Sequence, residues 1–220
     1  ATITGAGICR IERCVIKGQF TAATGTGSFG VTVVDSDWTI RISNTFIYDF
    51  PESGQQAIER LNASSSVITA HNVTVVNCLT GYVAGANSNF TAKNCLYDSQ
   101  GLGSADGFSG TFNGASNYNA SDIAADAPGA NSQNGVSTTY VDEAGDDFHL
   151  GSGDTSVKDL GTDLSGDATY PITVDFDNVT RSGSWDIGAD EVAAAGGAAP
   201  RSYRLVGAGE SLIGVGGLLA

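Results

Sequence analysis

The stretch Val73-Thr74-Val75-Val76-Asn77-Cys78-Leu79 is followed seventeen residues later by Phe90-Thr91-Ala92-Lys93-Asn94-Cys95-Leu96, in the same order of apolar residue, Thr, apolar residue, Asn, Cys and Leu. Ile40-Arg41-Ile42-Ser43-Asn44-Thr45-Phe46 fits the same frame, and Cys9-Arg10-Ile11-Glu12-Arg13-Cys14-Val15 fits it loosely. Short repeats of strand-forming residues are typical of stacked coils rather than of one globular core. The sequence therefore predicts an all-β solenoid.

Alignment of these repeats predicts columns of like side chains along the solenoid. One column is an asparagine ladder at a corner, where amides bond to one another and tolerate a left-handed backbone; it comprises Asn44, Asn77 and Asn94. A second column is a stack of small buried thiols that behave as modest hydrophobes; it comprises Cys14, Cys78 and Cys95. A disulfide between Cys78 and Cys95 stays open, because adjacent coils lie about 4.8 Å apart. We expect both columns to be structural.

Charge is spread unevenly along the chain. The 220 residues carry a formal net charge of −14, and residues 142–191 hold thirteen of the 24 acids against only Lys158 and Arg181. Nucleic-acid binding needs clustered Lys and Arg, and a membrane span needs about 18 consecutive apolar residues. The sequence contains neither, so we expect no nucleic-acid partner and no membrane insertion. The acidity is interpreted as a source of solubility, with calcium binding as the alternative.

Composition divides the chain into four parts. Residues 1–120 are predicted to form the coils, 121–140 a linker or last coil, 141–191 an acidic C-terminal cap, and 192–220 a linker with a glycine-rich apolar tail. The tail is too short and too interrupted for a membrane helix. We expect it to pack on a neighbouring chain as an added strand, with disorder as the alternative. The apolar residues assigned to this assembly role are Leu205, Val206, Leu212, Ile213, Leu218 and Leu219.

The acidic segment contains Asp147-Phe148-His149-Leu150, Asp159-Leu160-Gly161-Thr162-Asp163 and Trp185-Asp186-Ile187-Gly188-Ala189-Asp190-Glu191, in that order. Together with the coils, this order resembles secreted bacterial and phage proteins of the right-handed parallel β-helix type, in which such motifs close the helix. The resemblance covers about residues 1–191. It implies a right-handed parallel β-helix with a C-terminal cap and an extracellular or virion-surface location, but no known reaction.

Metal binding is weakly indicated. Members of that group often carry a D-x-D-G-x-x-R turn before the final motif, whereas this chain has Asn178 in place of the Gly. Asp175 and Asp177 of this turn are the candidate metal ligands, with calcium as the ion. A calcium loop of the helix-loop-helix type would need further spaced acids and a distal Glu, which are absent. We predict no other cofactor, and we expect His149 to satisfy hydrogen bonds within the cap.

Polysaccharide cleavage on such a scaffold requires paired carboxylates, and two carboxyl groups of a glycosidase lie about 5–9.5 Å apart. Asp35 and Asp37 flank Ser36 and are the candidate pair, with Arg41 beside them. Trp38 could stack on a sugar ring. The remaining candidate ligand-binding residues follow on the next loop and are Asp49, Glu52 and Glu59. The competing interpretation is a solvated acidic loop with a surface ion pair.

Two classes of function follow. The first is a non-enzymatic structural and recognition module on a phage virion or bacterial surface, with glycan-binding capacity and with assembly through the tail into a homo-oligomer or onto other surface chains. It rests on the loops between coils and on the lack of a convincing catalytic set. The second is a polysaccharide lyase or glycosidase of the β-helix type. A passive passenger or adhesin domain of a larger surface protein is a third alternative.

Overall fold

The computed structural model describes residues 7–18, 29–33, 37–60 and 65–192. Asp35 and the six tail residues assigned to assembly lie outside these ranges. Within them the fold is all-β, with a single 3-10 turn at Glu143–Gly145 and no α-helix. None of the described segments forms a helix with the length and apolar character needed to cross a membrane.

Two parallel sheets wind into a β-solenoid of about four turns. The first sheet has the order β1-β4-β6-β9-β11-β12, with β2 beside β4 and β8 beside β6. Its strands are β1 (Gly7–Glu12), β2 (Val15–Lys17), β4 (Trp38–Phe50), β6 (Val67–Cys78), β8 (Phe90–Lys93), β9 (Leu96–Asp98), β11 (Ala120–Ser121) and β12 (Gln133–Asn134). The second sheet has the order β10-β7-β5-β3 and consists of β3 (Phe29–Val33), β5 (Gln56–Arg60), β7 (Thr80–Val83) and β10 (Asp106–Ser109).

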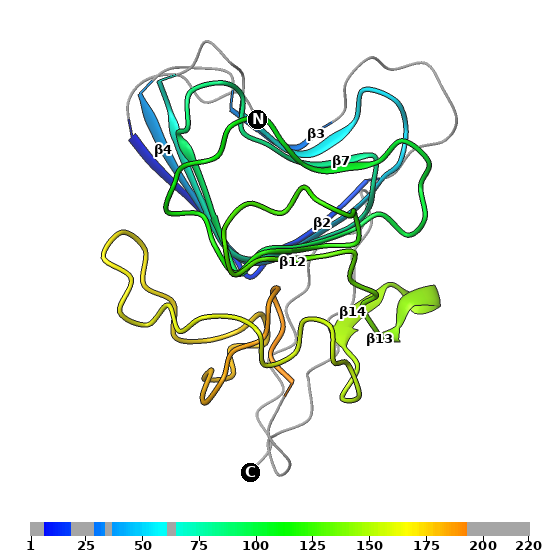
Figure 1. The fold of residues 1–220 in the computed structure, drawn as a ribbon. Coiled ribbons are helices and arrows are strands. Elements are labelled where there is room, and N and C mark those ends of the chain that lie inside the picture. Colours follow the sequence, from blue (N-terminus) through cyan, green and yellow to red (C-terminus); the bar gives the residue numbers. More distant parts are fainter. Residues whose placement is uncertain (1–6, 19–28, 34–36, 61–64, 193–220) are drawn as a thin grey trace, which may run out of the picture.

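Figure 1 looks roughly along the stack and shows a three-sided cross-section. The first sheet forms two sides because β4 and β6 bend midway, at Asn44 (φ 48°) and Asn72 (φ 52°). These values lie in the left-handed region, which asparagine tolerates better than most residues. Asn94 adopts the same conformation (φ 52°) between β8 and β9. We call the part of each long strand before the bend its first leg and the part after it its second leg.

The asparagine ladder exists, but one predicted member is wrong. Asn72 Nδ2 donates to Asn44 Oδ1 at 3.3 Å, and Asn94 Nδ2 donates to Asn72 Oδ1 at 3.0 Å. Asn77 lies at the next corner instead, where its amide donates to Asp49 at 2.8 Å. The error arises because Asn-Cys occurs both at the end of the second leg of β6 (Asn77-Cys78) and at the corner after β8 (Asn94-Cys95), so the sequence repeat aligned the second leg of one coil with the first leg of the next. The true register pairs Thr45 with Val73.

The thiol column is corrected by the same register. Thr74 pairs with Leu96, so the preceding residues Val73 and Cys95 lie side by side. Cys14 lies next to Thr45, which pairs with Val73, so Cys14 and Cys95 belong to one column. Cys78 is at a different level of the cross-section, opposite Phe50. All four cysteines are free thiols, so the disulfide between Cys78 and Cys95 does not form. Burial raises the pKa of both Cys78 and Cys95 to about 12, which keeps these thiols protonated and unreactive at neutral pH.

Two tyrosines fill the interior of the later coils. The Tyr97 ring is held between Gly81 and Gly107, where a Cβ atom would lie 2.5 and 2.6 Å from ring carbons. A larger residue at either position would displace the ring. The hydroxyls are satisfied by corner carbonyls: Tyr82 donates to Val73 at 2.8 Å and Tyr97 donates to Cys78 at 2.6 Å. The core is therefore apolar along its sides and hydrogen-bonded at its corners.

The last coil is much shorter than the first. Gly7 pairs with Trp38, one turn of 31 residues, whereas Ala120 pairs with Gln133, a turn of only 13 residues. The segment 121–140 thus contains a last coil, because β12 adds to β11. The chain then leaves the stack through the antiparallel pair β13 (Tyr140–Asp142) and β14 (Asp147–Leu150).

The acidic segment packs along the flank of the solenoid, so the expectation that it caps the end is wrong. Figure 1 shows it below the side of the triangle that contains β2 and β12. Outward apolar side chains of the second legs form one core with the acidic segment, because this side of the sheet is apolar on both faces; the participants include Phe46, Tyr48, Val76, Leu96, Phe148, Phe176 and Ile187. Contacts reach even the first coil, where Lys17 Nζ lies 2.6 Å from Asp146 Oδ2. We call residues 140–192 the flank unit.

Candidate functional site

The catalytic candidate Asp37 and the ligand-binding candidates Asp49 and Glu59 lie on different sides of the solenoid. Asp37, at the exposed start of β4, accepts a hydrogen bond from the Ser65 hydroxyl at 2.8 Å. Asp49 lies at the second corner, 3.4 Å from Lys17 Nζ. Glu59 belongs to the second sheet and accepts from the Thr32 hydroxyl at 3.2 Å. These carboxylates do not converge on one point.

The two remaining ligand-binding candidates do not join them. Glu52 is exposed in the turn after β4, where its carbonyl accepts from the Gln55 amide at 3.0 Å. Trp38 lies on the same side of its strand as Ile40, facing the core, and its ring covers Gly7 so closely that a Cβ there would lie 2.8 Å away. Trp38 therefore fills the first coil and cannot present its face to a sugar.

Arg41, the third catalytic candidate, lies on an outward face, and Arg10 lies directly beside it on the adjacent strand. Both guanidinium groups lie over the ring of Tyr170 from the flank unit, at 5.4 and 5.9 Å from its centroid. Such cation–π contacts favour a fixed orientation of the charge. The Tyr170 hydroxyl donates to Glu12 at 2.5 Å, and this carboxylate lies 3.9 Å from Arg10.

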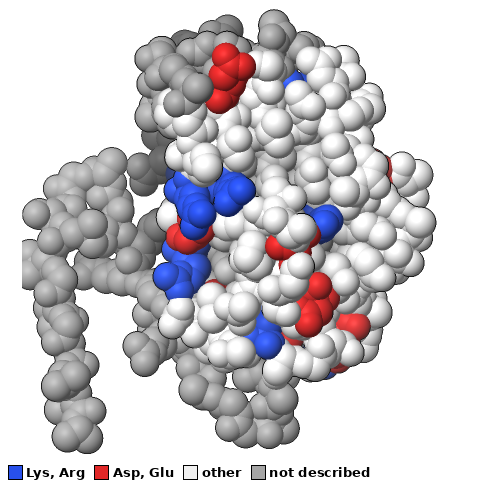
Figure 2. Space-filling view, turned by 90° about the vertical axis from the view of Figure 1, so that its left-hand side faces the viewer, with Lys and Arg blue, Asp and Glu red and all other residues white. Residues whose placement is uncertain are grey.

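We define the arginine face as the outward side of β1, β8 and the first legs of β4 and β6. Figure 2 looks at this side and shows basic side chains gathered with an acidic group between them. Four residues in register form a row through four parallel strands: Arg10, Arg41, Thr69 and Thr91. Thr69 is buried, and Lys93 lies two residues after Thr91 on β8. Ile8 is 61% exposed at the opposite edge. The face is thus flat, partly basic and built on rigid strands.

A polar groove of about 550 Å³ opens beside Lys93. Its walls are the corner residues Asn117 and Tyr118 on one side and the loop 162–167 of the flank unit on the other. Lys93 Nζ lies 2.6 Å from Asp167 Oδ2. Burial alone would raise the pKa of Asp167, but hydrogen bonds from Lys93 and from two backbone amides outweigh it and lower the pKa to about 2. The groove has the volume of a small-ligand site.

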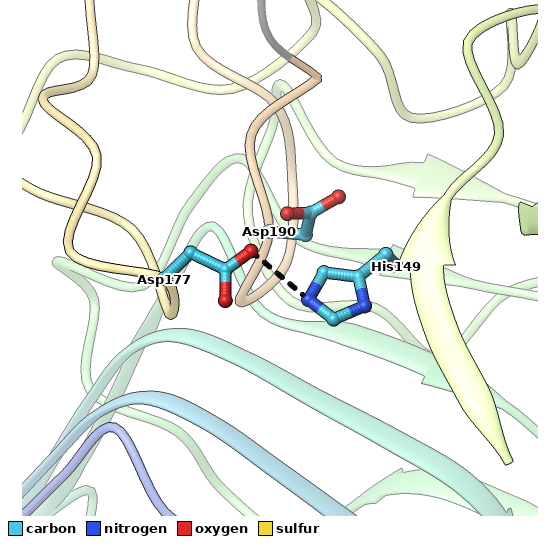
Figure 3. A group of neighbouring side chains, drawn as sticks. All are labelled: His149, Asp177 and Asp190. Carbon is cyan, nitrogen blue, oxygen red and sulfur yellow. Dashed lines mark ion pairs between the residues drawn. The ribbon is translucent and has the colours of Figure 1, made fainter. Parts of the chain in front are cut away.

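A second cluster lies inside the flank unit, where His149 of β14 meets Asp177 and Asp190 from two loops (Figure 3). His149 Nδ1 pairs with Asp147, and its Nε2 lies 3.3 Å from Asp177 Oδ2. Asp190 Oδ2 accepts the Leu150 amide at 2.8 Å. One ligand atom from each of His149, Asp177 and Asp190 lies within 4.8 Å of the others.

Of the two candidate metal ligands, the structure places only Asp177 in this cluster. Asp175 is buried, and its carboxylate accepts the amide of Val179 at 2.8 Å within a local turn. No sequence pattern indicated that His149 and Asp190 would join Asp177, since both lie in motifs interpreted as closing the helix. Their meeting depends on how β14 and the chain end fold back on each other.

Burial and neighbouring charges shift the pKa values of all three side chains in the cluster. Burial alone would lower the pKa of His149, but Asp190, Asp147 and Asp177 outweigh it and raise the pKa. Burial also raises the pKa of Asp177 and of Asp190. The His149 ring packs between Phe46 and Phe176, at centroid distances of 5.5 and 5.8 Å. The cluster is therefore a polar site in a largely apolar setting.

Arg181 anchors the end of the flank unit. Its buried guanidinium lies 2.8 Å from Glu191 and donates to the carbonyls of Gly188, Ala189 and Asp190 at 2.8 to 3.1 Å. Burial raises the pKa of Glu191 to about 7, although Arg181 opposes the shift. This arrangement gives the final W-D-I-G-A-D-E motif a structural role.

No protein-family model, no curated protein and no solved structure matches this chain. Its architecture, a parallel β-solenoid, is given by the sheet topology alone.

Proposed function

We propose that this protein is a non-enzymatic recognition module on a virion or bacterial surface, of the right-handed β-helix type, and that it binds an acidic glycan across the arginine face. The observation that carries this proposal is the pair Arg10 and Arg41, side by side on adjacent strands and oriented by Tyr170. Planar guanidinium groups match carboxylate and sulfate groups in a bidentate manner.

The geometry of the face suits an extended polymer better than a compact ligand. Adjacent strands lie about 4.8 Å apart, so Arg10 and Arg41 present their guanidinium groups at this spacing, whereas Thr69, the next residue of the row, is buried. The groove beside Lys93 continues the row at the far end. The chain as a whole is acidic, but exposed charges more than about 10 Å away are largely screened at 0.1 M salt. Local basic groups therefore dominate at this face.

The carboxylates near the face favour binding over cleavage. Glu12 accepts from the Tyr170 hydroxyl, and Asp167 is paired with Lys93. Both are engaged in contacts that a general acid or a nucleophile would have to give up. The lyase or glycosidase activity predicted as the alternative is therefore the weaker proposal. Assembly into a homo-oligomer, or onto other surface chains, through the residues after Val192 belongs to the same proposal.

Binding to polygalacturonate, an acidic glycan, tests the site. Arg41→Ala should weaken the affinity by about 10- to 150-fold, because one charge-assisted contact contributes about 1.5–3 kcal/mol. Lys158→Ala is the matched control, since it removes one positive charge paired with Asp159 in the flank unit. Titration calorimetry at 50 and 200 mM salt gives the affinity and its salt dependence.

Two results would contradict the proposal. Equal binding of a neutral glucan, or equal loss in both variants, would remove the arginine pair as the determinant. Shortening of the polymer during incubation would instead support the lyase or glycosidase alternative. For assembly, sedimentation of the full chain should give a larger mass than a chain that ends at Val192; identical monomers would remove the role of the tail.

A further inference from the structure

We propose that His149, Asp177 and Asp190 bind a zinc ion inside the flank unit. The three side chains come from β14 and from two separate loops, and they converge on one buried point against the second legs of the solenoid (Figure 3). The ion would tie together three segments that share few backbone hydrogen bonds. This proposal is independent of glycan binding.

The orientation of His149 is the first argument. Its Nδ1 is held by the carboxylate of Asp147, an arrangement that fixes the tautomer and leaves the Nε2 lone pair available. The imidazole ligands of zinc usually have such a carboxylate partner on the second nitrogen. Nε2 points toward Asp177 in Figure 3 and is buried without a hydrogen-bond partner among the described residues.

Asp177 supplies the second argument. The residue is only 7% exposed, and its Oδ1 atom is also buried without a hydrogen-bond partner in the described part of the chain. Its Oδ2 lies 3.3 Å from His149 Nε2, without the alignment of a hydrogen bond. Two acceptors at this distance repel unless a cation lies between them. Two ligands of a tetrahedral zinc ion, at 2.0–2.1 Å from the metal, would themselves be about 3.3 Å apart.

Asp190 completes the set of protein ligands. The Leu150 amide anchors one of its oxygens, so the carboxylate is held in place while its other oxygen stays available. The ligand atoms lie within 4.8 Å of one another, so binding needs only a modest inward movement of the third ligand. One imidazole and two carboxylates leave a fourth position for water, as in many zinc sites with three protein ligands.

The donor set favours zinc over calcium. Calcium takes six to eight oxygen ligands, whereas this cluster offers one nitrogen and few oxygens. Asp175, the additional carboxylate that a calcium loop would use, is committed to the Val179 amide. Zinc would also neutralise the charge that Asp147, Asp177 and Asp190 concentrate around one imidazole. The expected consequence is a flank unit that is more stable with metal than without it.

Calorimetry with the full chain, first stripped with EDTA, tests the site at pH 7.5. Zn²⁺ should bind with a stoichiometry of one, and Co²⁺ in its place should give the intense visible absorption of a tetrahedral ion. His149→Gln and Asp177→Asn should each weaken zinc binding by at least about 100-fold, because each removes a direct ligand. Asp163→Asn, an aspartate of the groove wall, is the control and should bind zinc as the wild type does.

The wild-type measurement decides the proposal even if a variant fails to fold, which circular dichroism would show. Absence of zinc binding at 100 µM by the wild type would overturn it. Unchanged binding and an unchanged cobalt spectrum in a folded His149→Gln protein would overturn it as well. A His149 ring that carries protons on both nitrogens in the presence of zinc, seen by nitrogen NMR, would identify the cluster as an ion pair instead.

Discussion

The solenoid and the flank unit satisfy their backbone polar groups by opposite means. In the solenoid, strands pair with strands, and side chains are needed only at the corners and in the interior. In the flank unit the described antiparallel pairing is limited to β13 with β14 and one isolated bridge between Val174 and Thr180, and aspartate side chains accept backbone amides in place of further strands. Asp154 alone accepts the amides of Thr139, Ser156, Val157 and Lys158. Much of the acidity in residues 142–191 is therefore structural.

We expect Arg181→Met to cause the largest loss of stability, and to cause it in the flank unit rather than in the solenoid. The substitution leaves four carbonyls and the buried Glu191 without their common partner, which should cost about 3–5 kcal/mol of the free energy of unfolding. Urea unfolding is followed by fluorescence in two single-tryptophan proteins. The Trp38→Phe protein reports the flank unit through Trp185, and the Trp185→Phe protein reports the solenoid through Trp38. We expect the Trp185 transition to shift and the Trp38 transition to persist. Equal shifts of both would show one cooperative unit.

Lowering the pH should decrease the free energy of unfolding through His71, which lies at the contact between the solenoid and the flank unit. This buried residue of β6 donates from Nδ1 to the Tyr170 carbonyl at 3.0 Å, and burial lowers its pKa to about 4. Because the unfolded chain has a His pKa near 6.5, it binds more protons than the folded chain between pH 6.5 and 4. The stability is therefore complete above pH 6.5 and falls as the pH drops toward 4, by roughly 3 kcal/mol.

The difference in unfolding free energy between wild type and His71→Gln, measured from pH 7 to pH 4, isolates this contribution from that of the many carboxylates. Asp167, Lys93 and Arg41 also face His71, and they are unchanged in the variant. The wild type should lose more stability than the variant over this range. Parallel curves would show that His71 does not couple the flank unit to pH.

A smaller effect distinguishes the two corners of the solenoid. Asn72→Ala removes two amide contacts of the buried ladder and places Ala at a left-handed φ of 52°, so we expect a loss of about 2–3 kcal/mol. Asn77→Ala carries the same left-handed backbone strain (φ 51°) but removes only one contact, at a half-buried corner, so it should cost about 1 kcal/mol less. Thermal unfolding compares them. A larger loss of stability in Asn77→Ala than in Asn72→Ala would contradict the greater stabilising role assigned to the buried ladder.

The sequence was sufficient for the coils but not for their register. Alternation of apolar residues and corner asparagines predicts stacked strands, and this prediction is confirmed. The motif recurs at two successive corners, so spacing alone could not tell Asn72 from Asn77. The run Val73-Thr74-Val75-Val76 did contain a usable signal, because it is rich in β-branched residues without a clear apolar–polar alternation, as in strands buried on both faces. It indicated that a further layer would cover this side.

The candidate sites show the same limit. Arg10 and Arg41 occupy equivalent positions in the sequence repeat, and the structure places them side by side. Tyr170, which orients both, is more than 120 residues away in a loop without periodicity. Asp177 was a metal candidate from its local motif, whereas its partners His149 and Asp190 are brought to it only by tertiary folding.

The shortening of the coils has a consequence for aggregation. A parallel sheet that ends in a long, flat strand presents unpaired amides and carbonyls to other chains. Here the final strand, β12, is two residues long, and the chain then turns away into an antiparallel hairpin. A turn of 13 residues is also too small to enclose a core that another coil could extend. This edge therefore offers little template for growth, and protection against fibre formation is built into the geometry of the stack.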